Sequence, residues 1–211
     1  MKTTIPLLVI VLLVCSCKNK ETVKDQNKQS TEIPIKEFRD EMRSIKNQAL
    51  RTSTGKNIQL IIREKTGGLN DFTVVSADFE NMNDSLIIKD ADPLQYANIV
   101  DLDHNGYDEL YLITSSSGSG SYGSIFGFAS NQDLSLTSIY IPEITENDVQ
   151  LNGSFYGYMG HDSIYFENDQ LFRKYPVYKE GDPNCCPSGG YKTHHYTLKA
   201  GEASWILAIE E

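Results

Sequence analysis

The sequence has few basic residues, few cysteines and a single tryptophan. Its 19 lysine and arginine residues stand against 29 aspartate and glutamate residues, which gives a formal net charge of −10. A chain this acidic, with no basic stretch interleaved with aromatic residues, argues against nucleic acid as a partner. A basic protein or a cation suits it better. The sequence also contains no internal repeat, coiled coil or low-complexity segment.

Long apolar runs are missing as well. The run from Ile5 to Val14 is too short for a permanent membrane-spanning helix and is typical of a signal peptide over residues 1–16. It ends at "VCSC", which places a branched aliphatic residue three positions before Cys17 and the small residue Ser16 directly before it, as lipoprotein signal peptidase requires. We therefore expect a lipid-anchored N-terminus at Cys17, a membrane attachment by acyl chains and a location in the bacterial cell envelope, at the outer membrane. An ordinary N-terminal anchor helix is the alternative.

Only two thiols remain after this processing, because Cys15 leaves with the signal peptide and Cys17 carries lipid. Cys185 and Cys186 are neighbours in the sequence. In an oxidising envelope they have only each other or a second molecule as a partner. We expect a disulfide between them that shapes the turn before Pro187.

The rest of the chain divides simply. Residues 17–33 are polar and charged, which predicts a lipidated, flexible tether. We expect residues 34–211 to form one domain. It opens with a segment over 34–50 whose apolar residues recur at three- and four-residue steps, the period of an amphipathic helix; they are Ile35, Phe38, Met42, Ile45 and Ala49.

Short runs of β-branched and aromatic residues follow that segment, each bounded by turn residues. Connections such as "NQD", "ND" and "AGE" have hairpin length, which favours antiparallel neighbours. The pattern predicts an all-β domain, an antiparallel β-sandwich or propeller-like domain of about eight to eleven short strands. The runs begin at residues 57, 72, 85, 96, 109, 124, 134, 163, 170, 191 and 204.

The segment "DLDHNGYDEL" resembles a calcium loop in its spacing. Oxygen-bearing residues alternate, a glycine supplies the tight turn, and a glutamate follows four residues after Asn105. The expected ligands are Asp101, Asp103, Asn105, the carbonyl of Tyr107 and Glu109. The loop is not an EF-hand, because Leu112 stands where a bidentate glutamate is required. Four carboxylates in ten residues repel one another without a cation, so we expect structural calcium; an Asx-rich hairpin that caps its own backbone is the alternative.

A glycine-rich stretch, "SSSGSGSYGSIFGF", comes next and contains Gly118, Gly120 and Gly123 in the spacing Gly-x-Gly-x-x-Gly. A dinucleotide-binding loop of that spacing lies between a strand and the helix that holds the pyrophosphate. Here the following residues have strand composition and offer no amphipathic helix. The nucleotide interpretation is therefore disfavoured, and the loop needs another explanation or is an idle turn.

The succession of this acidic loop, "SSSGSGSYGS", "SIYFENDQLFRKYPVYKEGDPN" and "PSGGYKTHHYTLKAGEASWIL" resembles the periplasmic inhibitors of invertebrate-type lysozyme. It is also similar to envelope immunity proteins that block lysozyme-like toxins. The resemblance covers roughly residues 97–208. These inhibitors carry a Ser-Gly-x-Tyr motif on a protruding loop, which matches Ser119, Gly120, Ser121 and Tyr122. The resemblance thus implies that these residues block the active site of a lysozyme or lysozyme-like hydrolase. The adjacent cysteines of "NCCPSGG" depart from the pattern of the lysozyme inhibitors.

The composition of this loop suits such a role on physical grounds. A lysozyme cleft holds two carboxylates and binds sugar hydroxyls, so a neutral loop that presents hydroxyl groups can imitate the sugar. No carboxylate lies between Ile113 and Gln132. The acidic charge of the chain should also speed its encounter with a basic lysozyme.

Signatures of catalysis are missing from the sequence. It contains no His-Glu-x-x-His, no Gly-x-Ser-x-Gly and no cysteine with a plausible catalytic partner. The adjacent His194 and His195 would point to opposite faces of a strand. We expect a protein that is not an enzyme, although its many carboxylates leave a glycosidase open. The competing hypothesis is a calcium-stabilised surface module that binds glycan or an adhesion partner through tyrosines; these are Tyr156, Tyr158, Tyr165, Tyr175 and Tyr178.

Overall fold

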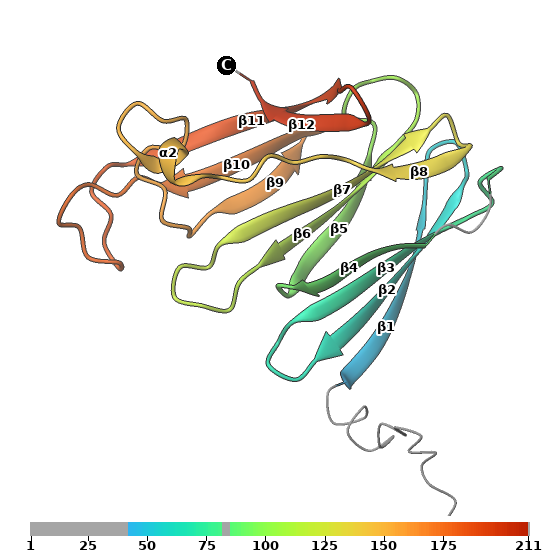
Figure 1. The fold of residues 1–211 in the computed structure, drawn as a ribbon, viewed down its shortest axis with the longest axis horizontal. Coiled ribbons are helices and arrows are strands. Elements are labelled where there is room, and N and C mark those ends of the chain that lie inside the picture. The colour runs from blue at the N-terminus through green and yellow to red at the C-terminus, as the bar shows by residue number, and fades with distance from the viewer. Residues whose placement is uncertain (1–41, 82–84, 211) are drawn as a thin grey trace, which may run out of the picture. The chain divides into compact units, whose positions relative to one another are not determined.

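The computed structural model describes residues 42–81 and 85–210, all of which belong to one compact unit, Pro34–Glu211. These residues form twelve strands and a four-residue helix, α2 (Glu146–Val149). The strands make three antiparallel sheets of four, each a meander in chain order. Figure 1 shows the sheet of β5–β8 between the other two. The expected antiparallel all-β fold is confirmed, in a propeller-like stack of sheets.

The first sheet contains β1 (Met42–Arg51), β2 (Asn57–Lys65), β3 (Asn70–Ala77) and β4 (Ser85–Ala91). The second contains β5 (Leu94–Val100), β6 (Glu109–Ser115), β7 (Gly123–Asn131) and β8 (Ser135–Ser138). The third contains β9 (Ser163–Glu167), β10 (Gln170–Pro176), β11 (Tyr191–Ala200) and β12 (Trp205–Ile209).

Strand β6 explains why the middle sheet can be covered on both faces. Successive side chains of a strand point to opposite faces, and six of the seven residues of β6 are buried. Leu110 and Leu112 lie in a core shared with residues of β2 and β3. Tyr111 and Ile113 lie in a second core, shared with residues of β10, β11 and β12. The continuous apolar run of β6 is thus the mark of a strand between two packed layers.

The helix predicted over residues 34–50 is wrong for residues 42–50, which the structure describes. Residues 42–51 form β1, which pairs with β2 from Met42↔Lys65 to Arg51↔Asn57; residues 34–41 lie outside the described residues. β1 is an edge strand with mostly exposed side chains, and Ile45 is 53% exposed. Its apolar residues therefore do not form the buried face of a helix. Hydrogen bonding to the edge of β2 stabilises the strand conformation instead.

Candidate functional site

The Ser-Gly-Ser-Tyr motif lies in the loop between β6 and β7, residues 116–122, and the loop closes on itself through hydrogen bonds. The N–H of Ser116 donates to the carbonyl of Tyr122 (2.9 Å), and the N–H of Tyr122 donates to Oγ of Ser116 (2.9 Å). At the tip, the N–H of Ser121 donates to the carbonyl of Gly118 (3.0 Å). The loop has a defined conformation supported by its own backbone.

Two further loops hold this one from the side. The N–H of His161 donates to the carbonyl of Gly120, and Nδ2 of Asn184 lies 3.4 Å from the carbonyl of Ser119. Asn184 is itself fixed, because its carbonyl accepts a hydrogen bond from the hydroxyl of Tyr178 (2.7 Å). Residues 41 and 65 positions further along the chain, His161 and Asn184, thus converge on the motif.

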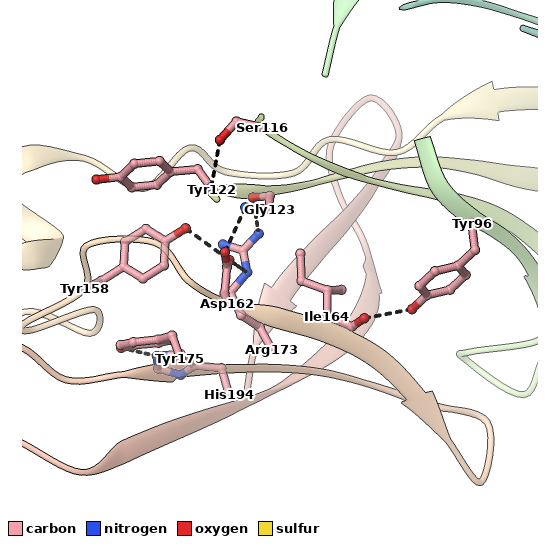
Figure 2. A network of polar contacts seen from close by, with 10 residues as sticks. All are labelled: Tyr96, Ser116, Tyr122, Gly123, Tyr158, Asp162, Ile164, Arg173, Tyr175 and His194. Atoms are coloured by element: carbon pink, nitrogen blue, oxygen red, sulfur yellow. Dashed lines mark hydrogen bonds and ion pairs between the residues drawn. The ribbon is translucent and has the colours of Figure 1, made fainter. Parts of the chain in front are cut away.

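A buried ion pair lies at the base of the loop, where β7 begins (Figure 2). Nε of Arg173 is 3.2 Å from Oδ2 of Asp162, and the two side chains are 7% and 0% exposed. Oδ1 of Asp162 accepts the N–H of Gly123 (2.7 Å), while Arg173 donates to the carbonyl of the same residue (3.1 Å). The hydroxyl of Tyr158 also donates to Asp162 (3.0 Å). Both backbone groups of Gly123 are therefore fixed by charged partners.

The sequence reasoning missed this network, although β10 carried a signal for it. Leu171, Arg173 and Tyr175 alternate on one face of the strand and all three are buried. A lone arginine at an inward position needs an acidic partner, since burying an unpaired charge is costly. The sequence could indicate that need but not that Asp162 meets it.

The side chains of the motif differ in what they offer to a partner. Ser119 is exposed, whereas Ser121 is half-buried, has φ of +41° and places Oγ 3.4 Å from the carbonyl of Gly118. Tyr122 is 47% exposed and packs edge-on against Tyr158, with ring centroids 5.8 Å apart. Figure 2 shows the Tyr122 hydroxyl pointing away from the network. Ser119 and Tyr122 thus present the outward hydroxyl groups.

Gly120 allows the chain to turn at the point where the Tyr122 ring lies. A Cβ atom at residue 120 would overlap that ring, so an alanine there would displace it. After Gly123 the chain continues directly as β7, with no helix. The strand-turn-helix arrangement of a dinucleotide loop is therefore not present at these residues.

The acidic loop between β5 and β6 brings together three of the five predicted ligands. Carboxylate oxygens of Asp101, Asp103 and Glu109 all lie within 4.8 Å of one another. Glu109 is fully buried, and its Oε2 accepts the N–H of Leu102 (2.8 Å). Its Oε1 has no hydrogen-bond partner among the described residues. Burial, together with the charges of the neighbouring aspartates, raises the pKa of Glu109 to about 8.

Asn105 and Tyr107 complete this loop. The N–H of Asn105 lies within hydrogen-bond distance of Asp101 (3.0 Å) and Asp103 (3.2 Å), and Oδ1 of Asn105 accepts the N–H of Tyr107 (2.8 Å). These are the Asx-type bonds of the alternative interpretation, and they satisfy part of the carboxylate charge. They do not reach Oε1 of Glu109. An oxygen-binding cation fits the carboxylate set, because it would satisfy that buried oxygen.

The remaining predicted site residues lie in other described segments or outside the described residues. Cys185 and Cys186, both exposed, are joined by a disulfide in the turn that follows Asn184. His194 and His195 face opposite sides of β11, since His194 contacts Phe155 and His195 stacks on Phe172. Cys17, the signal peptide and the tether lie outside the described residues. No helix in the described ranges is long and apolar enough to cross a membrane.

Most tyrosines of the glycan-binding hypothesis are buried and cannot form a binding surface. Tyr158, Tyr175 and Tyr178 are 9%, 0% and 5% exposed. They pack in and beside a small core with Phe155, because aromatic rings with satisfied polar tips gain more from burial than from solvent. Of the five, Tyr156 is 41% exposed and Tyr165 is half-buried.

Comparisons with known proteins add little to this geometry. No protein-family model matches the chain, and no curated protein matches it. One solved structure that it resembles is an exo-1,5-α-L-arabinanase from a bovine ruminal metagenomic library, at 11% identity and a TM-score of 0.35. That match covers 81% of this chain and 58% of the arabinanase chain. A likeness this distant carries no functional conclusion.

Proposed function

We propose that this protein is a non-catalytic, lipid-anchored protein of the bacterial envelope that inhibits a lysozyme or lysozyme-like hydrolase. The motif Ser119–Tyr122 enters the active-site cleft of the target, and the protein itself carries out no reaction. The resemblance of residues 97–208 to lysozyme inhibitors supports this proposal. Lipidation at Cys17 would hold the inhibitor where an incoming hydrolase reaches the cell wall.

One structural observation carries the proposal: a loop without carboxylates presents two outward hydroxyl groups while its base is fixed by a buried ion pair. Ser119 is exposed and Tyr122 is 47% exposed, and Asp162 and Arg173 hold the first residue of β7. A pre-organised loop loses little conformational entropy on binding. Tyrosine adds a rigid ring with a polar tip, as is common in binding loops.

The test is inhibition by the chain from Lys18 onward, which contains all described residues. This chain should form a stoichiometric complex with a lysozyme and stop its hydrolysis of cell-wall substrate. The assay needs lysozymes of several classes, since the sequence does not select one. A chain that binds sugar and leaves every lysozyme active would instead support the glycan-binding module.

We further propose that the acidic loop holds a structural calcium ion. Asp101, Asp103 and Glu109 supply carboxylate oxygens, with Asn105 and the carbonyl of Tyr107 completing the expected set. The observation in favour is that Oε1 of the fully buried Glu109 finds no hydrogen-bond partner among the residues that the structure describes. Calcium at about a hundred times its dissociation constant would add roughly 2.7 kcal/mol to the free energy of unfolding.

For a domain of this size, that gain corresponds to a melting temperature roughly 5–10 °C higher in calcium than in EDTA. Glu109→Gln should remove the difference, whereas Glu202→Gln, a change at an exposed glutamate outside the loop, should keep it. Differential scanning calorimetry gives the readout. Equal melting temperatures in calcium and in EDTA for the unaltered chain would contradict the proposal that the acidic loop holds a calcium ion.

A further inference from the structure

Within residues 42–81 and 85–210, strand β7 has no partner strand along half of one edge. It has nine residues, but β8 has four, and the pairing of the two strands covers only Phe128 to Asn131 of β7. One more hydrogen bond follows, from the N–H of Ile139 to the carbonyl of Gly127 (2.8 Å). Tyr140 then turns away and exchanges hydrogen bonds with Trp205 and Leu207 of β12. The chain thus switches from the second sheet to the third.

The backbone groups on this edge can be assigned by alternation. In an antiparallel pair, the N–H and C=O of every second residue point away from the neighbouring strand. Gly123 bonds Asp162 and Arg173 on the side away from β6, and the carbonyl of Gly127 bonds Ile139 on that same side. The N–H and C=O of Ile125, midway between them, therefore also face away from β6. Within the described ranges, neither group has a hydrogen-bond partner on that side.

A groove of about 840 Å³ runs along this edge. Residues of β7 and of the segment that follows Ile139 line it, and the lining is mainly apolar; the apolar side chains include Ile125, Ile139, Ile141, Ile144, Val149 and Tyr196. Tyr122 also lines the groove. The outward groups of Gly123 and the carbonyl of Gly127 are already bonded. The three residues between them, Ser124 to Phe126, span about 10 Å of strand, which is room for about three residues of extended chain.

Charge limits what can occupy the groove. Glu143 and Glu146 line it and are exposed, whereas the arginine in its lining, Arg173, is already paired with Asp162. The whole chain is also acidic, at −10. A basic occupant gains from this field, and an acidic one is repelled.

We infer that the groove binds an extended peptide segment of a partner protein, with alternating apolar side chains and flanking basic residues, which adds a strand to β7. The backbone of the segment exchanges hydrogen bonds with the N–H and C=O of Ile125. Its apolar side chains contact the apolar lining of the groove, and its basic residues lie near Glu143 and Glu146. The groove adjoins the Ser-Gly-Ser-Tyr motif, because Tyr122 belongs to both. The test of peptide binding nevertheless does not depend on lysozyme inhibition.

The probe is a fluorescent peptide of sequence Lys-Val-Thr-Val-Thr-Lys, titrated into the chain from Lys18 onward. The control is the same peptide with N-methyl groups on its four central residues, which keeps the side chains and removes the backbone donors. We expect the methylated peptide to bind at least tenfold more weakly. The double change Glu143→Gln and Glu146→Gln should weaken the unmethylated peptide severalfold and reduce its salt dependence, without altering the melting temperature.

Amide hydrogen exchange locates the contact. Saturating peptide should slow exchange at the N–H of Ile125, while the N–H of Gly123, already bonded to Asp162, should change little. Equal binding of both peptides, no binding at millimolar concentration, or binding without protection of Ile125 would overturn the inference. Binding that appears only after residues 18–41 are removed would also overturn it, by assigning the groove to the chain's own N-terminal segment.

Discussion

Arg173 and Asp162 link the interior of the protein to the proposed inhibitory loop. Both side chains are almost fully buried, and together they bond the N–H and C=O of Gly123. A buried pair is not in itself a large source of stability, but removing one partner leaves a buried charge without compensation. The geometry of the loop base should therefore depend on both residues at once.

Arg173→Met should lower the free energy of unfolding by about 3–5 kcal/mol, because the carboxylate of Asp162 remains buried without its cation. Adding Asp162→Asn to that variant should recover part of the loss. Lys46→Met breaks the exposed ion pair of Lys46 with Glu64 and should change stability little. Urea unfolding measures all three, and an Arg173→Met effect as small as that of Lys46→Met would contradict the role of the buried pair.

His194 gives the fold a predicted sensitivity to acid. Its ring lies against Phe155, with centroids 4.5 Å apart, and Nε2 is 3.2 Å from the hydroxyl of Tyr175. Burial lowers the pKa of His194 below its usual 6.5, and the positive charges of Lys192 and Arg173 lower it further. The folded state thus binds a proton less readily than the unfolded state.

Stability should therefore fall as the pH drops below about 6.5, the pKa of an unperturbed histidine. The loss ends once the pH has passed below the lowered pKa of the folded state. His194→Gln should flatten this part of the profile, which melting temperatures between pH 7.5 and 5 would reveal. A variant with the same pH slope as the unaltered chain would show that His194 is not the group responsible.

At the level of elements, the sequence predicted strands well where burial alternates or is continuous. All eleven predicted runs overlap observed strands, and the bounds of β6 and β9 agree at both ends. The exception is β1, whose apolar residues at helical spacing suggested a helix. An exposed edge strand buries few side chains, so its sequence need not alternate between apolar and polar residues. Pairing with β2, which the spacing of apolar residues does not reveal, stabilises β1 as a strand.

Gly127 shows a requirement of β7 that the hydrophobic pattern does not reveal. A Cβ atom there would lie 2.8 Å from Cδ1 of Ile139 and 3.1 Å from the ring of Tyr111, whereas one at Gly118 would meet no atom within 4 Å. Gly127→Ala should therefore cost about 1–3 kcal/mol through overpacking. Gly118→Ala should cost less than 1 kcal/mol. Urea unfolding compares the two variants. Equal effects would show that the core around Tyr111 accommodates the added methyl group without a loss of stability.

At the level of the whole molecule, the loop that carries the Ser-Gly-Ser-Tyr motif meets two loops and a strand that are distant from it in the sequence. The contacts that define the site join residues 39, 50 and 65 positions apart, as in Asp162 with Gly123, Arg173 with Gly123, and Asn184 with Ser119. Local spacing could single out the motif and the acidic loop, because each is a continuous segment. It could not show which side chains hold the motif in place, since that depends on how the second and third sheets pack.

The most direct test of the central claim is lysozyme inhibition by variants of the motif. A central interface residue that loses a buried hydrogen bond or an aromatic anchor costs about 2 kcal/mol, which is roughly thirtyfold in affinity. Ser119→Ala and Tyr122→Ala should each raise the inhibition constant by about that factor with melting temperatures close to that of the unaltered chain. Ser117→Ala, at an exposed serine of the same loop, should inhibit as the unaltered chain does. Superimposable inhibition curves for all four proteins, or weakened inhibition only where the fold is also lost, would contradict the account.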